Sequence, residues 1–175
     1  MQSTPMASPF ETPVDVLNYA LTLEHLEATF YREGMEQFTG DDFVTAGFQA
    51  SARDRFVLIG EQEADHVTTL TSVIESLGGT PVEEATYDFG YEDLPGFFAV
   101  AQALEDTGVA AYQGAAQYLI DEDELLTAAL TIHGVEARHA SYLALFNVAS
   151  PFPDAVNPTL TPDEVLEIAG PFIVS

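Results

Sequence analysis

The sequence predicts an all-α protein built on a four-helix bundle with one long crossover connection. Apolar residues recur at helical spacing through four long segments. A turn-rich, acidic stretch over residues 78–94 divides these segments into two pairs. Both pairs carry the same order of glutamate, tyrosine and histidine side chains, which indicates an internal repeat of helical hairpins.

The first pair of helices is expected over residues 13–37 and 51–77. A capping threonine followed by proline begins the first of them. Residues 39–42 break that helix, and a short linking helix is expected over residues 43–48. Two consecutive glycines end the second long helix.

The stretch over residues 78–94 is long enough to cross the whole bundle. Fully extended it spans roughly 55–60 Å, whereas a helix of about 25 residues is roughly 37 Å long. The third helix, expected over residues 96–119, therefore runs parallel to the second. A short connection then makes the fourth helix, over residues 124–147, its antiparallel neighbour.

The chain is expected to form one domain with two flanking segments. Residues 1–12 read as a flexible tail, residues 13–148 as the bundle, and residues 149–175 as a proline-rich segment that packs on the bundle. Thr161 and Pro162 begin one short C-terminal helix. The N-terminus lacks the features of a signal peptide and no apolar run could span a membrane, which predicts a cytoplasmic protein.

The composition is strongly acidic. The chain has four basic residues, all arginine, and 29 acidic residues, and its formal net charge is −25. Such a charge disfavours nucleic-acid and anionic-membrane partners. It favours a halophilic origin, in which salt screens the repulsion, over an ordinary acidic protein. The absence of cysteine excludes disulfides and metal–thiolate sites.

The pattern that carries chemistry is a repeated Glu-x-x-His pair. Glu63 and His66 lie in the second helix, and Glu136 and His139 have the same spacing in the fourth. Residues three apart lie on one face of a helix, so each pair presents a carboxylate and an imidazole together. A single pair of this kind is weak evidence for a metal site, but its repetition is a stronger signal.

The other two helices complete the set. Glu24 precedes Tyr31 by seven residues, and Glu105 precedes Tyr112 by seven, which is two turns along one face. Four inward glutamates and two inward histidines are the ligand set of di-iron and di-manganese carboxylate bundles. The proposed metal ligands are Glu24, Glu63, His66, Glu105, Glu136 and His139.

Four carboxylates balance the charge of two divalent cations, and this oxygen-rich set with two imidazoles suits iron or manganese. We therefore expect two Fe or two Mn ions per chain, with Glu63 and Glu136 as bridges. Tyr31 and Tyr112 are expected outside the ligands as hydrogen-bond partners or redox relays, or else as plain core aromatics.

Several alternatives remain open. Glu27, three residues after Glu24, could replace it, although only Glu24 matches the spacing of the second repeat. His133 is a candidate for an outer role. Gly60 and Gly108 either leave space for an oxidant or water, or pack against bulky neighbours. A bundle of buried, salt-bridged carboxylates without metal is the remaining structural alternative.

The sequence also resembles a known group of proteins. It is similar to the ferritin-like superfamily, which includes bacterioferritin, rubrerythrin and manganese catalase. The stretch over residues 18–31 and the closing residues 171–174 resemble its desiccation-related branch more specifically. The resemblance covers residues 13–174 and implies the bundle fold and a metal centre at the six ligands. No fifth bundle helix of the kind used by ferritin cages is predicted.

The expected function is a di-metal protein that reacts with O₂ or peroxide as a ferroxidase, peroxidase or catalase-like oxidoreductase. One alternative is a non-catalytic stress or desiccation protein that uses the bundle for metal binding or structure. A second is an assembled scaffold that ignores the metal. Self-association into a homo-oligomer is a further expectation, because Phe38, Phe43 and Phe48 offer extra apolar positions.

Overall fold

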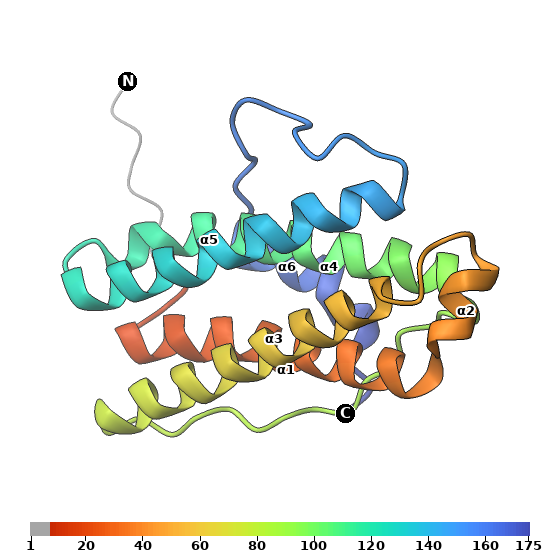
Figure 1. Cartoon of the computed structure of the whole chain (residues 1–175). Helices are drawn as coiled ribbons and strands as arrows, with labels where there is room; N and C mark the ends of the chain where they lie inside the picture. Colours follow the sequence, from red (N-terminus) through yellow and green to blue (C-terminus); the bar gives the residue numbers. More distant parts are fainter. Residues whose placement is uncertain (1–7) are drawn as a thin grey trace.

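The computed structural model describes residues 8–175, and over that range the chain is a bundle of helices without an extended strand (Figure 1). Residues 1–7 of the expected flexible tail lie outside the described residues. The tail expectation does not fit Phe10, whose ring contacts the rings of Tyr19 and Tyr118 at centroid distances of 5.4 and 5.2 Å. No helix in residues 8–175 combines the length and the apolar character needed to cross a bilayer.

Four long helices form the bundle: α1 (Pro13–Gln37), α3 (Ala52–Ser76), α4 (Leu94–Ala115) and α5 (Asp123–Phe146). Helix α1 packs along α3, and α4 packs along α5. Between α3 and α4 the chain crosses the whole length of the bundle, so that these two helices run parallel (Figure 1). The predicted all-α bundle with one long crossover is therefore confirmed.

The linking helix differs from its prediction. Helix α2 spans Gly40–Thr45, three residues earlier than the predicted 43–48. Asp42 caps the start of this helix: its carboxylate accepts hydrogen bonds from the backbone N–H and the hydroxyl of Thr39, each at 2.7 Å. The stretch that reads as a helix breaker is therefore the cap of the next helix.

Short elements complete the fold: η1 (Ala116–Leu119), α6 (Pro162–Ala169) and η2 (Gly170–Phe172). The predicted third helix thus ends its α-helical part at Ala115 and continues as the 3-10 turn η1. The C-terminal residues pair with the crossover through one antiparallel bridge between Tyr87 and Ile173. Buried Val165 in α6 joins the main core, so this segment packs on the bundle.

The core has two chemically different ends. At one end, Phe30 stacks on Phe97 with ring centroids 4.6 Å apart, and further phenylalanines pack around them. Aliphatic side chains such as Leu21, Leu70 and Ile132 fill the other end. Phe38 and Phe43 are buried in the aromatic cluster and Phe48 packs against it, so these residues give no support for an oligomer interface.

Candidate metal centre

Each of the four bundle helices contributes a glutamate to a cluster in the middle of the core. These residues are Glu24 in α1, Glu63 in α3, Glu105 in α4 and Glu136 in α5, and each has an exposed fraction of 0%. His66 and His139, one turn after Glu63 and Glu136, are also buried. The structure therefore brings all six sequence-predicted side chains together.

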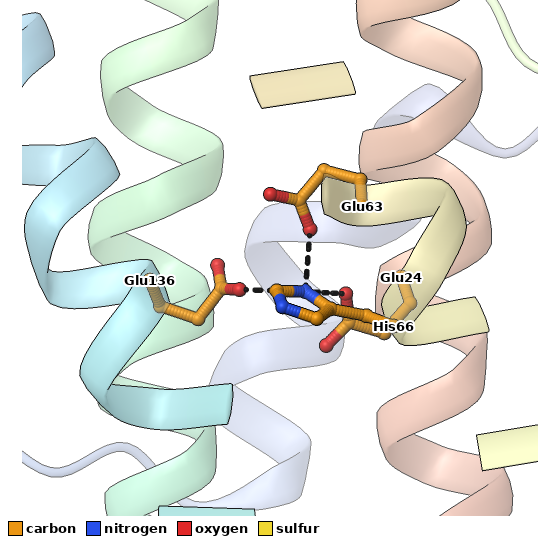
Figure 2. A group of neighbouring side chains, drawn as sticks. All are labelled: Glu24, Glu63, His66 and Glu136. Carbon is orange, nitrogen blue, oxygen red and sulfur yellow. Dashed lines mark hydrogen bonds and ion pairs between the residues drawn. The ribbon is translucent and has the colours of Figure 1, made fainter. Parts of the chain in front are cut away.

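The first group of potential ligands comprises Glu24, Glu63, His66 and Glu136, and the four ligand atoms lie within 4.8 Å of one another. Nδ1 of His66 lies 3.1 Å from a Glu24 oxygen, 3.0 Å from a Glu63 oxygen and 3.1 Å from a Glu136 oxygen (Figure 2). One ring nitrogen carries at most one proton, so it cannot donate to three carboxylates at once.

The second group comprises Glu63, Glu105, Glu136 and His139. Nδ1 of His139 lies 2.8 Å from a Glu63 oxygen and 3.3 Å from a Glu105 oxygen. On the other side of the ring, Nε2 donates to Oε1 of Gln62 at 2.7 Å. This hydrogen bond keeps a proton on Nε2, so a metal ion that displaces the proton from Nδ1 would find that lone pair facing the carboxylates.

Glu63 and Glu136 belong to both groups. A carboxylate has two oxygens, so a residue shared by two ligand groups can supply one oxygen to each cation. The positions of Glu63 and Glu136 are therefore compatible with the predicted role of each as a bridge between two metal ions. That bridging role stays a prediction.

Within the described part of the chain, Oε2 of Glu136 has no hydrogen-bond partner, and Glu63 Oε1, Glu105 Oε2 and Glu136 Oε1 have only a histidine Nδ1 that they share with other carboxylates. An unsatisfied buried polar atom costs about 1–3 kcal/mol, and more when it is charged. Two divalent cations among these atoms would satisfy them and neutralise four carboxylates. The residues present therefore fit a pair of iron or manganese ions.

The electrostatics of the cluster are those of a site crowded with negative charge. Burial raises the pKa of Glu136 to about 8, and the neighbouring Glu63 and Glu105 add to the effect. Burial also raises the pKa values of Glu24 and Glu105. Burial acts the same way on Glu63, but hydrogen bonds from His139 and His66 outweigh it and lower its pKa to about 2.

Burial has the opposite effect on the pKa values of the two histidines, because protonation gives the ring its charge. Burial lowers the pKa of each ring, but hydrogen bonds to the surrounding carboxylates outweigh it. They raise the pKa of His66 to about 12 and that of His139 to about 10. In the metal-free chain, protons on the imidazoles thus take the place that cations would occupy.

Each of the two tyrosines forms a hydrogen bond to a glutamate in the other half of the repeat. Tyr31 in α1 donates its hydroxyl proton to Oε1 of Glu105 in α4. Tyr112 in α4 donates to Oε1 of Glu24 in α1. Burial raises the pKa of both phenols well above the ordinary value, and the adjacent carboxylates raise it further. Each tyrosine is therefore a protonated donor that orients one carboxylate.

Comparison with known proteins identifies the family. The sequence profile of the ferritin-like domain matches residues 12–147, which include all six clustered side chains. The chain belongs to the ferritin-like domain family.

Individual relatives are distant. A crystal structure of ferritin-like, diiron-carboxylate proteins from Bacillus anthracis str. Ames aligns with a TM-score of 0.66 at 19% identity, over 76% of this chain and 93% of that one. That similarity concerns the fold. Protein rds1 of Schizosaccharomyces pombe is 25% identical over 175 residues, which are 98% of this chain and 42% of rds1. This ferritin-like chain thus spans less than half the length of that relative.

Glu27 is a buried carboxylate whose place in the site the sequence did not settle. The structure puts Glu24 in the first ligand group and buries Glu27 one turn further along α1, outside both groups. Burial, followed by the charge of Glu136, raises its pKa well above the ordinary value. Its spacing of three residues from Glu24 was the feature of the sequence that indicated a position on the same helix face.

Gln62 was not predicted as part of the site, because its contact with His139 joins two different helices.

The two glycines beside the site lie close to neighbouring side chains, although Gly60 also borders a hollow that opens to the surface. A Cβ atom on Gly60 would lie 2.8 Å from Cβ of Tyr31, so the packing alternative holds there. A Cβ on Gly108 would lie 3.0 Å from a Glu27 oxygen and 3.2 Å from a Glu136 oxygen. The space at Gly108 is therefore taken by carboxylates. His133 is half-buried and lies outside both ligand groups.

Proposed function

We propose that this ferritin-like protein binds two iron or two manganese ions, one in each ligand group, and uses them to react with O₂ or peroxide. The observation that carries the proposal is the convergence of four fully buried carboxylates and two histidine rings into two ligand groups in the core, with too few donors for their oxygens. The description of the Bacillus anthracis neighbour as a diiron-carboxylate protein supports iron. The sequence resemblance to desiccation-related proteins stays a prediction.

Two divalent ions would together supply two electrons, which with two protons reduce O₂ to hydrogen peroxide or hydrogen peroxide to two waters. The protein's own contribution is positional. Glu63 and Glu136 face both groups, while Tyr31 and Tyr112 hold the outer oxygens of Glu105 and Glu24. The helices exclude bulk water, which strengthens every electrostatic interaction inside.

Metal analysis of the purified protein tests the binding step. We expect about two metal ions per chain, and a large loss of metal in the double variant Glu63→Gln, Glu136→Gln, which keeps side-chain volume. Asp65→Asn is the matched control, because Asp65 lies inside the same motif but is exposed. Helicity confirms that each variant folds. A double variant that keeps its full metal content would refute the assignment.

Turnover is measured separately, as consumption of O₂ or peroxide by the metal-loaded protein. We expect consumption that needs the metal and disappears in the double variant. Metal bound in the expected amount without any turnover would instead support the non-catalytic alternative, in which the bundle binds metal or serves a structural role under stress. The bound metal would then be the ion that this site buffers.

A further inference from the structure

An apolar cavity of about 30 Å³, not fully enclosed and bordered by exposed Thr69, lies between the bundle helices at the end away from the phenylalanine cluster. All four long helices line it, with Ala20, Leu70, Tyr112 and Ile132 among the lining residues. Its surface is almost wholly carbon. None of the residues proposed as metal ligands lines it, so it is a separate feature of the core.

The cavity lies about one helical turn from the first ligand group. Ala20 precedes Glu24 by four residues in α1, and Leu70 follows His66 by four in α3. Four residues along a helix correspond to roughly 6 Å. The ring of Tyr112 borders the cavity, and its hydroxyl group is bonded to Glu24. Tyr112 therefore contacts both the cavity and a ligand of this group.

The chemistry of the lining selects the occupant. A water molecule needs roughly 10–15 Å³ of such space and two or more polar partners, and apolar cavities that offer no partners stay dry. This cavity has room for about two water-sized spheres but almost no polar surface. Peroxide would lose the hydrogen bonds of both hydroxyl groups there, whereas an apolar diatomic gas loses nothing comparable.

The other tyrosine has different surroundings. Tyr31 borders a hollow of about 270 Å³ that opens to the surface and is also lined by Arg32 and Glu61. On its inner side, the Tyr31 ring meets the ring of Phe97 edge-on, with centroids 6.3 Å apart. The repeat therefore places a tyrosine at both ends of the site, but the carbon-lined cavity borders Tyr112.

We propose that this cavity is a binding site for dioxygen, positioned to supply the ligand group of Glu24 and His66. The supply role rests on the proposed function and names O₂, rather than peroxide, as the oxidant. The binding itself needs no metal and depends only on the size and apolar lining of the cavity.

Xenon, an apolar atom used as a probe, tests the binding in the metal-free full-length protein. We expect saturable changes in the methyl resonances of Leu17, Leu70 and Ile132, and line broadening of the same methyls by dissolved O₂. Methyls at the aromatic end, such as those of Leu143, should not respond. An absence of any response at the cavity methyls would overturn the proposal, while the metal content would still decide the proposed function.

Filling the cavity tests its role. Ala129 and Ala144 both lie in α5, but only Ala129 lines the cavity. We expect Ala129→Leu to abolish the xenon response and lower the metal-dependent rate at limiting O₂ about tenfold, with the peroxide rate unchanged. Ala144→Leu should change neither. If Ala129→Leu loses xenon binding but keeps its O₂ dependence, the supply role is wrong. If the wild-type protein binds no metal, the proposed function fails even when xenon binds.

Discussion

At the scale of single residues, Gly60 and Gly134 occupy comparable helix-interior positions with opposite surroundings. A Cβ on Gly60 would come within 2.8 Å of the Tyr31 Cβ, which is part of a fully buried side chain. A Cβ on Gly134 would meet no atom within 4 Å. Glycine at Gly60 is therefore required by close packing, whereas at Gly134 it only weakens the helix.

We predict opposite effects of alanine at these positions. Gly134→Ala should stabilise the fold by about 0.5–1 kcal/mol through helix propensity. Gly60→Ala should destabilise it by roughly 1–3 kcal/mol, because overpacking displaces Tyr31. Denaturant unfolding of the two variants measures the difference. Stabilisation by both substitutions would show that the contact of Gly60 with Tyr31 is loose.

At the scale of helices, the end of α1 is held by an arginine from α3. Nε of Arg53 donates to the carbonyl oxygen of Phe38 at 2.8 Å, and its Nη2 donates to the carbonyl of Met35. These carbonyls lie at the C-terminus of α1, where the backbone acceptors lack helical partners and the helix dipole is negative. No long helix carries a basic residue in its own last turn, so this cap is supplied from a neighbour.

Removal of this cap should destabilise the hairpin of α1 and α3. We predict that Arg53→Gln lowers the free energy of unfolding by about 1.5–3 kcal/mol, the range for hydrogen bonds of charged groups. Arg55→Gln is the matched control, because Arg55 lies two residues away and is exposed. Equal losses in the two variants would indicate that net charge, rather than the cap, decides the effect.

At the scale of the whole molecule, the metal-free protein concentrates titratable groups in its core. The pKa of Glu136 rises from 4.5 to about 8, so folding favours its protonated form, and that stabilisation is lost as the pH rises towards 8. The pKa of His139 rises from 6.5 to about 10, so its stabilisation is present below pH 6.5 and is lost towards pH 10. Both groups therefore make the metal-free fold weaker at higher pH.

We predict that the melting temperature of the metal-free protein falls steadily between about pH 5 and pH 10. Bound cations should remove most of this slope, because they stabilise the deprotonated carboxylates that the metal-free core disfavours. Thermal unfolding at constant ionic strength, with and without metal, checks both statements. A metal-free melting temperature that rises over this range would contradict the assigned pKa directions.

The sequence by itself determined the helices, the crossover and the six clustered side chains. Helical periodicity and spacing are local properties, so a Glu-x-x-His pair such as Glu63 and His66 predicts its own shared face wherever the helix lies. The repeat then predicts that both hairpins aim their ligands at one core. Capping signals located most helix ends, and Thr39 with Asp42 was misread because a cap and a breaker use the same residue types.

Only the tertiary structure decided which groups meet across helices. The crossed bonds from Tyr31 to Glu105 and from Tyr112 to Glu24 depend on how α1 lies against α4, and no spacing along one helix encodes that contact. The contact between Gln62 and His139 joins α3 to α5 in the same way. The apolar cavity beside Tyr112 is likewise a property of packing, because it depends on the summed side-chain volumes of four helices.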